Sequence, residues 1–270
     1  MIPVGFTYER PDTLDAALAL LAEHGDDAKV LAGGHSLLPV MKLRLAAPEL
    51  LIDIGRLDEL RYSRVDGDQL AIGAGTRHHD LATSDVVAAE APLLGAVART
   101  VGDPQVRHRG TLGGSLAHAD PASDLPAAVL ALGGAIVMRG PRGERQVPVE
   151  EFFTGLFSTA LEPDELVVEI RVPRTGSAGW AYEKFTRRAN DWAIVAVAVV
   201  DGRVGLVNMG PTPLRASATE AALAGGASIE EAAALADEGT DPPADLAGTK
   251  EYRRHLARLL TRRALTTAAR

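Results

Sequence analysis

The sequence contains no cysteine among its 270 residues. A chain without thiols cannot hold a thiolate-ligated iron–sulfur cluster, a cysteine-ligated zinc ion or a disulfide. It also cannot attach a cofactor through a cysteine side chain. Any redox group that this chain uses must therefore be bound by other means or be carried by a second chain.

The chain also lacks a surplus of basic residues. Its 28 Lys and Arg are outnumbered by 36 Asp and Glu, which gives a net charge of −8. Nucleic acids and anionic membranes are bound through clustered positive charge. We therefore expect neither a nucleic acid nor an anionic membrane surface as a partner.

Long hydrophobic runs are missing as well. The longest apolar run, Ala193–Val200, has the length of a strand and is far shorter than a membrane span. The first twelve residues, MIPVGFTYERPD, lack the basic and apolar regions of a signal peptide. We expect a cytoplasmic protein without a membrane span.

The first 55 residues alternate between helix and strand patterns. Apolar spacing predicts a helix over 11–24, and short apolar runs predict strands at Lys29–Ala32 and Leu50–Ile54. An apolar segment, Leu37–Leu45, lies between the two strands. This order is typical of a small α/β unit.

The patterns in the remaining chain predict further strands and further helices. Residues 85–100 resemble one alanine-rich helix, whereas 102–126 show no periodicity and are expected to form a long functional loop. The Arg-rich end, 253–263, is expected to be a solvated helix face. The other expected elements are strands at Gln69–Ala74, Ala135–Met138, Arg145–Val149 and Leu166–Val172, a helix at Pro126–Leu132, a linker at Pro173–Gly179, an alternating segment at Trp180–Arg187, a hairpin of Ala193–Val200 with Arg203–Met209, and a terminal helix from about 250.

A first glycine-rich segment directly follows a predicted strand. Its residues are Ala32, Gly33, Gly34, His35 and Ser36. Glycines permit positive φ and close ligand approach, and consecutive N–H groups can form a nest for an anion such as a pyrophosphate. A tight turn with a helix cap explains the same residues. The spacing is not the G-x-G-x-x-G fingerprint, which argues against a Rossmann dinucleotide site.

A second glycine-rich segment runs from Arg109 to Asp124. Thr111 and Ser115 flank its Gly113-Gly114 pair, and hydroxyl groups suit phosphate oxygens. A downstream carboxylate, Asp124, can accept both hydroxyls of a ribose. Two separate anion nests suit a diphosphate better than a monophosphate, although a glycine-rich surface loop remains the alternative.

Other catalytic patterns are weak. His78, His79, His108 and His118 lack the helical i, i+4 spacing of a zinc site, so we expect no metal. A G-x-S-x-G elbow is absent, which argues against a Ser–His–Asp hydrolase.

A third candidate cluster contains Lys184 and Trp192. A lysine near the N1/O2 edge of a flavin would stabilise the reduced anion, and an aromatic side chain could cover the ring. The alternative is a strand with one exposed charge and a core tryptophan.

Three segments together carry a specific resemblance. The runs AGGHSLLPVMKLRLAAPELLIDI (32–54), DPQVRHRGTLGGSLAHADPASDLPA (103–127) and GWAYEKF (179–185) resemble the FAD-binding medium subunits of the carbon monoxide dehydrogenase and xanthine dehydrogenase family of molybdenum hydroxylases. The likeness covers nearly the whole chain, including the segment 208–215, NMGPTPLR.

The resemblance implies an α+β (mixed α/β) fold. Expected are a two-subdomain FAD-binding fold of the vanillyl-alcohol oxidase/PCMH type and a C-terminal small antiparallel sheet with helices. On this sequence, the implied divisions are an N-terminal α/β subdomain at 1–56, a middle α+β subdomain at 57–174 and a C-terminal domain at 175–270.

The resemblance also implies which residues contact a non-covalently bound FAD. Two loops would hold the diphosphate, Asp124 would meet a ribose, Leu166 would line the adenine pocket and Lys184 would lie near the flavin ring. The implied contacts are Ala32, Gly33, Gly34, His35, Ser36, Leu37, Thr111, Gly113, Gly114, Ser115, Ala117, Asp124, Leu166 and Lys184.

The implied function is that of an oxidoreductase subunit that transfers electrons. A large partner subunit would carry the molybdenum cofactor and a small one the 2Fe–2S clusters, in a heterotrimer that pairs into a dimer of heterotrimers. Electrons would pass from the clusters through FAD to an external acceptor. One alternative is a free-standing FAD-dependent oxidoreductase of the vanillyl-alcohol oxidase or enolpyruvyl-sugar reductase type, and another is a non-enzymatic flavin-binding module.

Overall fold

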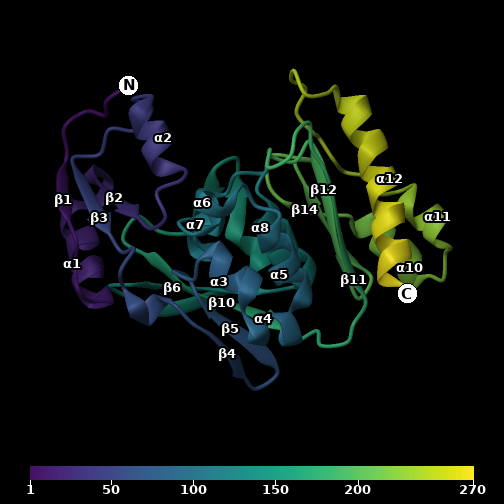
Figure 1. Ribbon diagram of the computed structural model, residues 1–270, viewed down its shortest axis with the longest axis horizontal. Coiled ribbons are helices and arrows are strands. Elements are labelled where there is room, and N and C mark those ends of the chain that lie inside the picture. The colour runs from purple at the N-terminus through teal and green to yellow at the C-terminus, as the bar shows by residue number, and fades with distance from the viewer.

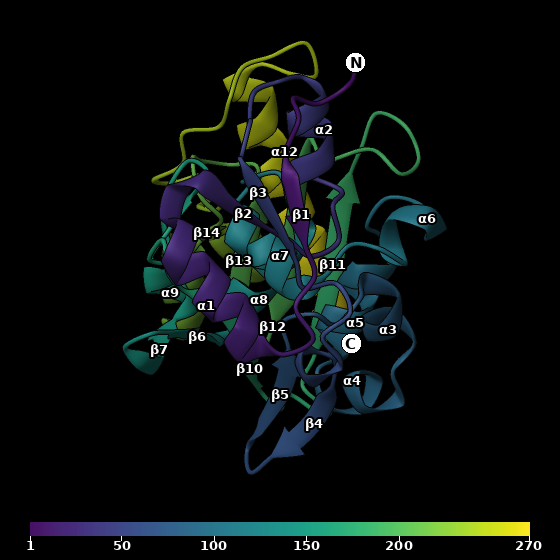
Figure 2. The same ribbon diagram turned by 90° about the vertical axis from the view of Figure 1, so that its left-hand side faces the viewer.

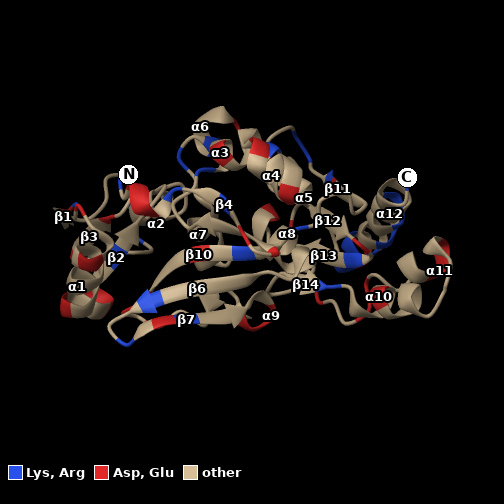
Figure 3. Ribbon diagram, turned by 90° about the horizontal axis from the view of Figure 1, so that it is seen from below, with Lys and Arg blue, Asp and Glu red and all other residues tan.

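A computed structural model describes residues 1–270 and arranges them in three parts, each built on its own sheet. The parts follow one another along the long axis of the molecule (Figure 1). Acidic and basic residues are interspersed over all three parts (Figure 3). No helix of the structure combines the length and the apolar character that crossing a membrane requires.

The N-terminal part is a small parallel sheet of order β1-β3-β2. Leu14, Ala17, Leu18 and Leu21 form the buried stripe of its first helix, and Thr13 caps that helix by accepting from the Ala16 N–H. The predicted α/β unit is therefore present, with one strand that the sequence did not indicate. Its elements are β1 (Thr7–Glu9), α1 (Leu14–His24), β2 (Ala28–Leu31), α2 (Leu37–Lys42) and β3 (Leu50–Asp53).

The middle part is an antiparallel sheet of order β4-β5-β10-β6-β7, covered on one face by helices. Its elements are β4 (Ser63–Asp66), β5 (Gln69–Gly73), α3 (His78–Thr83), α4 (Asp85–Glu90), α5 (Pro92–Arg99), α6 (Pro104–Arg107), α7 (Leu112–His118), α8 (Asp124–Leu132), β6 (Ala135–Gly140), β7 (Gly143–Pro148), α9 (Val149–Phe152), the hairpin β8 (Phe153–Gly155) and β9 (Ser158–Thr159), and β10 (Leu166–Pro173).

Two predictions for the middle part are wrong in detail. The single helix expected over 85–100 is broken at Ala91, because Pro92 disfavours the helical conformation for the residue before it. The long loop expected over 102–126 contains the short helices α6 and α7. Their few turns are stabilised by the caps Asp103 and Thr111 rather than by an apolar stripe, which explains the missing periodicity.

The C-terminal part is the predicted small antiparallel sheet with helices, of order β11-β12-β13-β14. Its central strand β12 is apolar throughout because helices cover both faces: α8 of the middle part packs on one, and the terminal helix packs on the other. The elements are β11 (Trp180–Phe185), β12 (Val195–Val200), β13 (Arg203–Val207), β14 (Leu214–Arg215), α10 (Ser217–Ala224), α11 (Ile229–Ala233) and α12 (Lys250–Ala268).

The terminal helix departs from the expected solvated face at Arg253, whereas Arg262 and Arg263 are exposed as expected. Arg253 of α12 is only 1% exposed. Its Nη2 donates to both carboxylate oxygens of Asp245 at 2.8 Å, and its Nη1 donates to the carbonyl of Ile194. The arginine therefore fixes the 239–249 segment against the sheet, and such a pairing cannot be read from residue spacing.

Candidate functional site

One cavity of about 840 Å³ is lined by all three parts of the chain. Its walls come from the segment after β2, from α7, from the start of β10 and from β11. Seen from the N-terminal side, α7 lies behind the small parallel sheet (Figure 2). Every residue that the resemblance implied as a cofactor contact lines this cavity: Ala32, Gly33, Gly34, His35, Ser36, Leu37, Thr111, Gly113, Gly114, Ser115, Ala117, Asp124, Leu166 and Lys184.

The first glycine-rich segment connects β2 to α2 and offers free backbone donors. The N–H groups of Gly33, Gly34, His35 and Ser36 donate to no acceptor of the chain. Gly34 has a φ of +80°, which a residue with a side chain rarely adopts. Four consecutive N–H groups without an acceptor, in residues that line a cavity, are the kind of backbone arrangement that can bind an anion.

The two glycine-rich segments pack backbone against backbone. A Cβ on Gly33 would lie 2.4 Å from the carbonyl oxygen of Arg109 and 2.9 Å from the Cα of Gly110. The guanidinium of Arg77 binds the same carbonyl of Arg109 and reaches the carbonyl of Gly55 at 2.8 Å. Position 33 therefore requires a glycine, because a side chain there would separate the two segments, which together line one side of the cavity.

The second segment is a capped helix rather than an open nest. The N–H of Gly113 donates to the carbonyl of Ala74 at 2.9 Å, and that of Gly114 donates to the Thr111 hydroxyl at 3.1 Å. The N–H of Ser115 donates to the carbonyl of Thr111. The expectation of two equivalent backbone nests is therefore wrong, because here the N–H groups already have partners.

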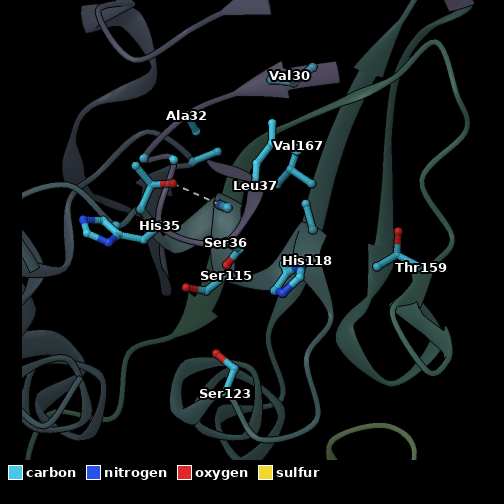
Figure 4. Close-up of a pocket in the computed structure, with 18 of the residues that line it drawn as sticks. Val30, Ala32, His35, Ser36, Leu37, Ser115, His118, Ser123, Thr159 and Val167 are labelled. Carbon is cyan, nitrogen blue, oxygen red and sulfur yellow. Dashed lines mark hydrogen bonds between the residues drawn. The ribbon is translucent and has the colours of Figure 1, made fainter. Parts of the chain in front are cut away.

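The second segment presents a hydroxyl to the cavity. Figure 4 shows the side chains of Ser36, from the first segment, and Ser115, from the second, and both residues line the cavity. The only hydrogen-bond partner of the Ser115 hydroxyl is His78 Nε2, at 3.0 Å. Free N–H groups on one side and serine hydroxyls between the segments together suit the oxygens of a phosphate.

His78 lies in a buried polar environment, where its Nε2 contacts the Ser115 hydroxyl and the backbone of the second segment. The side chain is 4% exposed, and its Nε2 also lies 3.0 Å from the carbonyl of Thr111. Burial, opposed in part by this hydrogen bond, lowers the pKa of His78 to about 4, and the nearby His35 and Arg77 act in the same direction. His78 is therefore neutral at physiological pH.

This burial predicts an acid-dependent loss of stability. Below pH 6.5 the unfolded chain protonates His78, whereas the folded chain does so only near pH 4, so the unfolded state binds more protons in that window. The free energy of unfolding should therefore fall by about 3 kcal/mol through this group as pH drops from 6.5 to 4. Urea titrations of wild type and His78→Gln at several pH values measure how much His78 contributes to the change in the free energy of unfolding. Parallel pH profiles for the two proteins would contradict the prediction.

Asp124 and Lys184 form one buried ion pair. Lys184 Nζ of β11 lies 2.7 Å from Asp124 Oδ2 at the start of α8, and the Tyr182 hydroxyl donates to Asp124 Oδ1 at 2.5 Å. Lys184 also donates to the carbonyl of Thr100 at 3.2 Å. From the sequence, Asp124 is expected at a ribose and Lys184 at the flavin ring. The structure joins the two side chains in an ion pair, which ties the C-terminal sheet to the middle part.

The positive charge of Lys184 stabilises the ionised form of the buried Asp124 carboxylate. Burial raises the pKa of Asp124, and the attraction to Lys184 offsets part of this effect. Burial and the neighbouring carboxylate raise the pKa of Tyr182 well above its ordinary value, so the phenol remains a donor. Both carboxylate oxygens of Asp124 therefore already accept one hydrogen bond each.

Sequence reasoning missed part of the cavity wall. Phe157 and Thr159 reach it from the β8–β9 hairpin, and the Phe157 ring lies 5.2 Å from the ring of His118. This hairpin is too short to produce an alternating pattern, so no sequence signal marked it. Trp192, which the sequence did single out, lines the cavity and is 59% exposed, so it is not a core tryptophan.

The cavity fits an extended dinucleotide. Its volume lies within the range of cofactor pockets, which are mostly apolar with a few placed polar groups. The lining is apolar in part, with Val30 and Val167, and polar in part, with Asp124 and Lys184. A diphosphate at the Gly33–Ser36 loop would leave room for a group on either side.

Comparisons with known proteins agree with this geometry. A sequence-family model described as the FAD binding domain in molybdopterin dehydrogenase matches residues 4–175. A second, described as the CO dehydrogenase flavoprotein C-terminal domain, matches residues 180–268. Together the two models account for nearly the whole chain.

Individual relatives match over the full length. The chain is 45% identical to the carbon monoxide dehydrogenase medium chain of Hydrogenophaga pseudoflava, covering 99% of this chain and 98% of that one. It is 37% identical to the 6-hydroxypseudooxynicotine dehydrogenase complex subunit alpha of Paenarthrobacter nicotinovorans, with coverage of 99% and 96%. A solved structure of carbon monoxide dehydrogenase from Hydrogenophaga pseudoflava superposes with a TM-score of 0.95, 47% identity and coverage of 100% and 99%.

Proposed function

Because this chain belongs to the family of FAD-binding medium subunits of carbon monoxide dehydrogenase and related molybdenum hydroxylases, we propose that it relays electrons within such a complex. FAD is held non-covalently and, when bound, supplies the carrier between the 2Fe–2S clusters of a partner subunit and an external acceptor. The structural observation that carries this proposal is the loop from Gly33 to Ser36, which lines the cavity and has four consecutive N–H groups without an acceptor in the chain.

The chain's own residues have distinct roles in holding the cofactor. The loop from Ala32 to Leu37 binds the diphosphate through backbone N–H groups, and Ser115 adds a hydroxyl from the second segment. Leu166 lines the adenine pocket. Lys184 lies near the flavin ring, held by Asp124, which also remains the candidate for a ribose contact.

Trp192 is our candidate for the side chain that covers the flavin ring. It lines the cavity, it is 59% exposed, and it lies close in sequence to Lys184. Tryptophan offers a large flat surface that stacks well on an aromatic ring. The neighbouring Asn190 and Asp191 also line this end of the cavity.

The partners follow from the family and from the composition. A chain without cysteine cannot ligate the 2Fe–2S clusters through its own thiolates, which supports a separate small subunit for them. A large subunit carries the molybdenum cofactor and the substrate site. We propose a heterotrimer that pairs into a dimer of heterotrimers, located in the cytoplasm, with domain divisions near residues 56 and 174 in this chain.

The identity and attachment of the cofactor give a direct prediction. Acid precipitation of the purified chain should release all of its flavin into the supernatant, and chromatography should identify the flavin as FAD. FMN lacks the diphosphate that the Gly33–Ser36 loop is proposed to bind. Flavin that remains in the pellet, or release of FMN alone, would contradict the proposal.

Electron transfer is tested in the complex. We expect this chain, expressed with the cluster-bearing and molybdenum-bearing subunits of its host, to show flavin bleaching when carbon monoxide or an aldehyde is added anaerobically. The same chain alone should be inert to both substrates yet be reduced by dithionite. Substrate-driven bleaching of the isolated chain would refute the relay and favour a free-standing oxidoreductase.

A further inference from the structure

His78 is a buried polar side chain that the proposed function does not yet use. It begins α3, on a different segment from either glycine-rich loop, and it lines the cavity. Its Nε2 lies 3.0 Å from both the Thr111 carbonyl oxygen and the Ser115 hydroxyl oxygen. Its Nδ1 is buried and has no hydrogen-bond partner.

These contacts determine which ring nitrogen carries the proton. A carbonyl oxygen can only accept, so the contact with Thr111 requires a hydrogen on Nε2. With the proton on Nδ1 instead, an N–H would be buried without an acceptor, and the Nε2 lone pair would face the carbonyl. Both penalties favour the Nε2–H tautomer of the neutral ring.

The tautomer in turn determines what the Ser115 hydroxyl can do. A hydroxyl has one hydrogen to donate and two lone pairs that accept. Because Nε2–H donates, Ser115 Oγ accepts on that side and keeps its own hydrogen. The hydroxyl has no other partner in the chain and lines the cavity, so this hydrogen is available to a ligand there.

We propose that His78 is a positioning residue of the cofactor site, which makes Ser115 a hydrogen-bond donor to a phosphate oxygen of the bound dinucleotide. This inference rests on the proposed function, since it takes FAD as the ligand. It gives the second segment a side-chain donor for an anion, although the backbone N–H groups of that segment are already bonded. With the opposite tautomer, the Ser115 hydrogen would point to His78, and a lone pair would face the phosphate.

The His78 ring is a weak base, and this agrees with the proposed tautomer. Protonation would add a second N–H at Nδ1, where no acceptor is present. Burial lowers the pKa of His78 to about 4, so the ring stays neutral and keeps the same donor pattern across the physiological range.

The first test measures FAD affinity of the flavin-free full-length chain. Ser115→Ala should weaken binding about 10- to 100-fold, the usual cost of one hydrogen bond to a charged group. His78→Leu should weaken binding several-fold when Ser115 is present and cause no further loss in the Ser115→Ala background. His78→Gln, whose amide can donate from a similar position, should restore affinity close to wild type, and circular dichroism shows whether each variant is folded.

The second test needs no variant. In flavin-free protein labelled with ¹⁵N-histidine, the ring nitrogen shifts of His78 should identify the Nε2–H tautomer at pH 7. The Nδ1–H tautomer, or losses from His78→Leu and Ser115→Ala that simply add, would overturn this inference while leaving FAD binding intact. Failure of the wild-type chain to bind FAD would overturn the proposed function and this inference together.

Discussion

Replacing Lys184 by methionine is expected to lower the free energy of unfolding by about 3–5 kcal/mol, as measured by urea denaturation of the flavin-free chain. The side chain of Asp124 is 5% exposed and that of Lys184 10%, so the pair is shielded from water. Methionine retains the length of the lysine but removes its charge. Asp124 would then be buried with only the Tyr182 hydroxyl as a partner, which is the costly case of an uncompensated buried charge.

The loss of stability in Lys184→Met should depend on pH, because it comes from the charge of Asp124. Without Lys184, the raised pKa of Asp124 should rise further, so the folded state keeps a proton that the unfolded state releases above about pH 4. The loss of stability should therefore be smallest at low pH and grow as pH increases toward 7. The matched double variant, Lys184→Met with Asp124→Asn, removes both charges and should recover much of the loss. Equal losses in the single and double variants would contradict the argument.

The features that sequence reasoning predicts well are those set by local patterns. The apolar stripe from Leu14 to Leu21 predicts α1, and the apolar run Ala193–Val200 predicts the hairpin strand β12, which the structure shows to be buried throughout. The segment after the strand Ala28–Leu31 is predicted from its two glycines and serine as an open loop, and the structure shows that its N–H groups have no acceptor in the chain. Such patterns depend only on neighbours in the chain.

The features that sequence reasoning misses depend on contacts between distant segments. Nothing near His78 in the sequence shows that it faces Ser115, 37 residues away. The spacing of Asp124 and Lys184 likewise gives no sign that they pair across 60 residues. Neither residue type nor the family resemblance indicates these two contacts, because packing between distant segments decides which groups these side chains meet.

The second glycine pair lines the cavity as the sequence predicts, but the structure gives these glycines a packing role rather than free N–H groups. Gly113 and Gly114 resemble a nest, yet their N–H groups bond to Ala74 and Thr111. A Cβ on Gly113 would lie 2.5 Å from the Cβ of Ala74, so this glycine is needed for close packing of α7 on the end of β5. A glycine that permits a close backbone approach and one that binds an anion look the same in a sequence.

Gly33→Ala is expected to weaken FAD binding on the order of 100-fold. The added Cβ would lie 2.4 Å from the Arg109 carbonyl oxygen and 2.9 Å from the Arg109 carbonyl carbon, both backbone atoms that cannot rotate away. The two segments must therefore separate, and overpacking of this kind costs about 1–3 kcal/mol. About 3 kcal/mol corresponds to roughly 100-fold in affinity. Separation displaces the free N–H groups of the first loop from the Ser115 hydroxyl, so one diphosphate cannot reach both.

The control for this prediction is Gly5→Ala, since a Cβ on Gly5 meets nothing within 4 Å and the residue does not have a positive φ. It should bind FAD as the wild type does, so a loss confined to Gly33→Ala comes from the contact with Arg109. Titration of the flavin-free proteins with FAD, followed by quenching of flavin fluorescence, measures both affinities. Near-native affinity in Gly33→Ala would show that the two segments need not touch to form the site, and the cofactor would then have to be bound by the first loop alone.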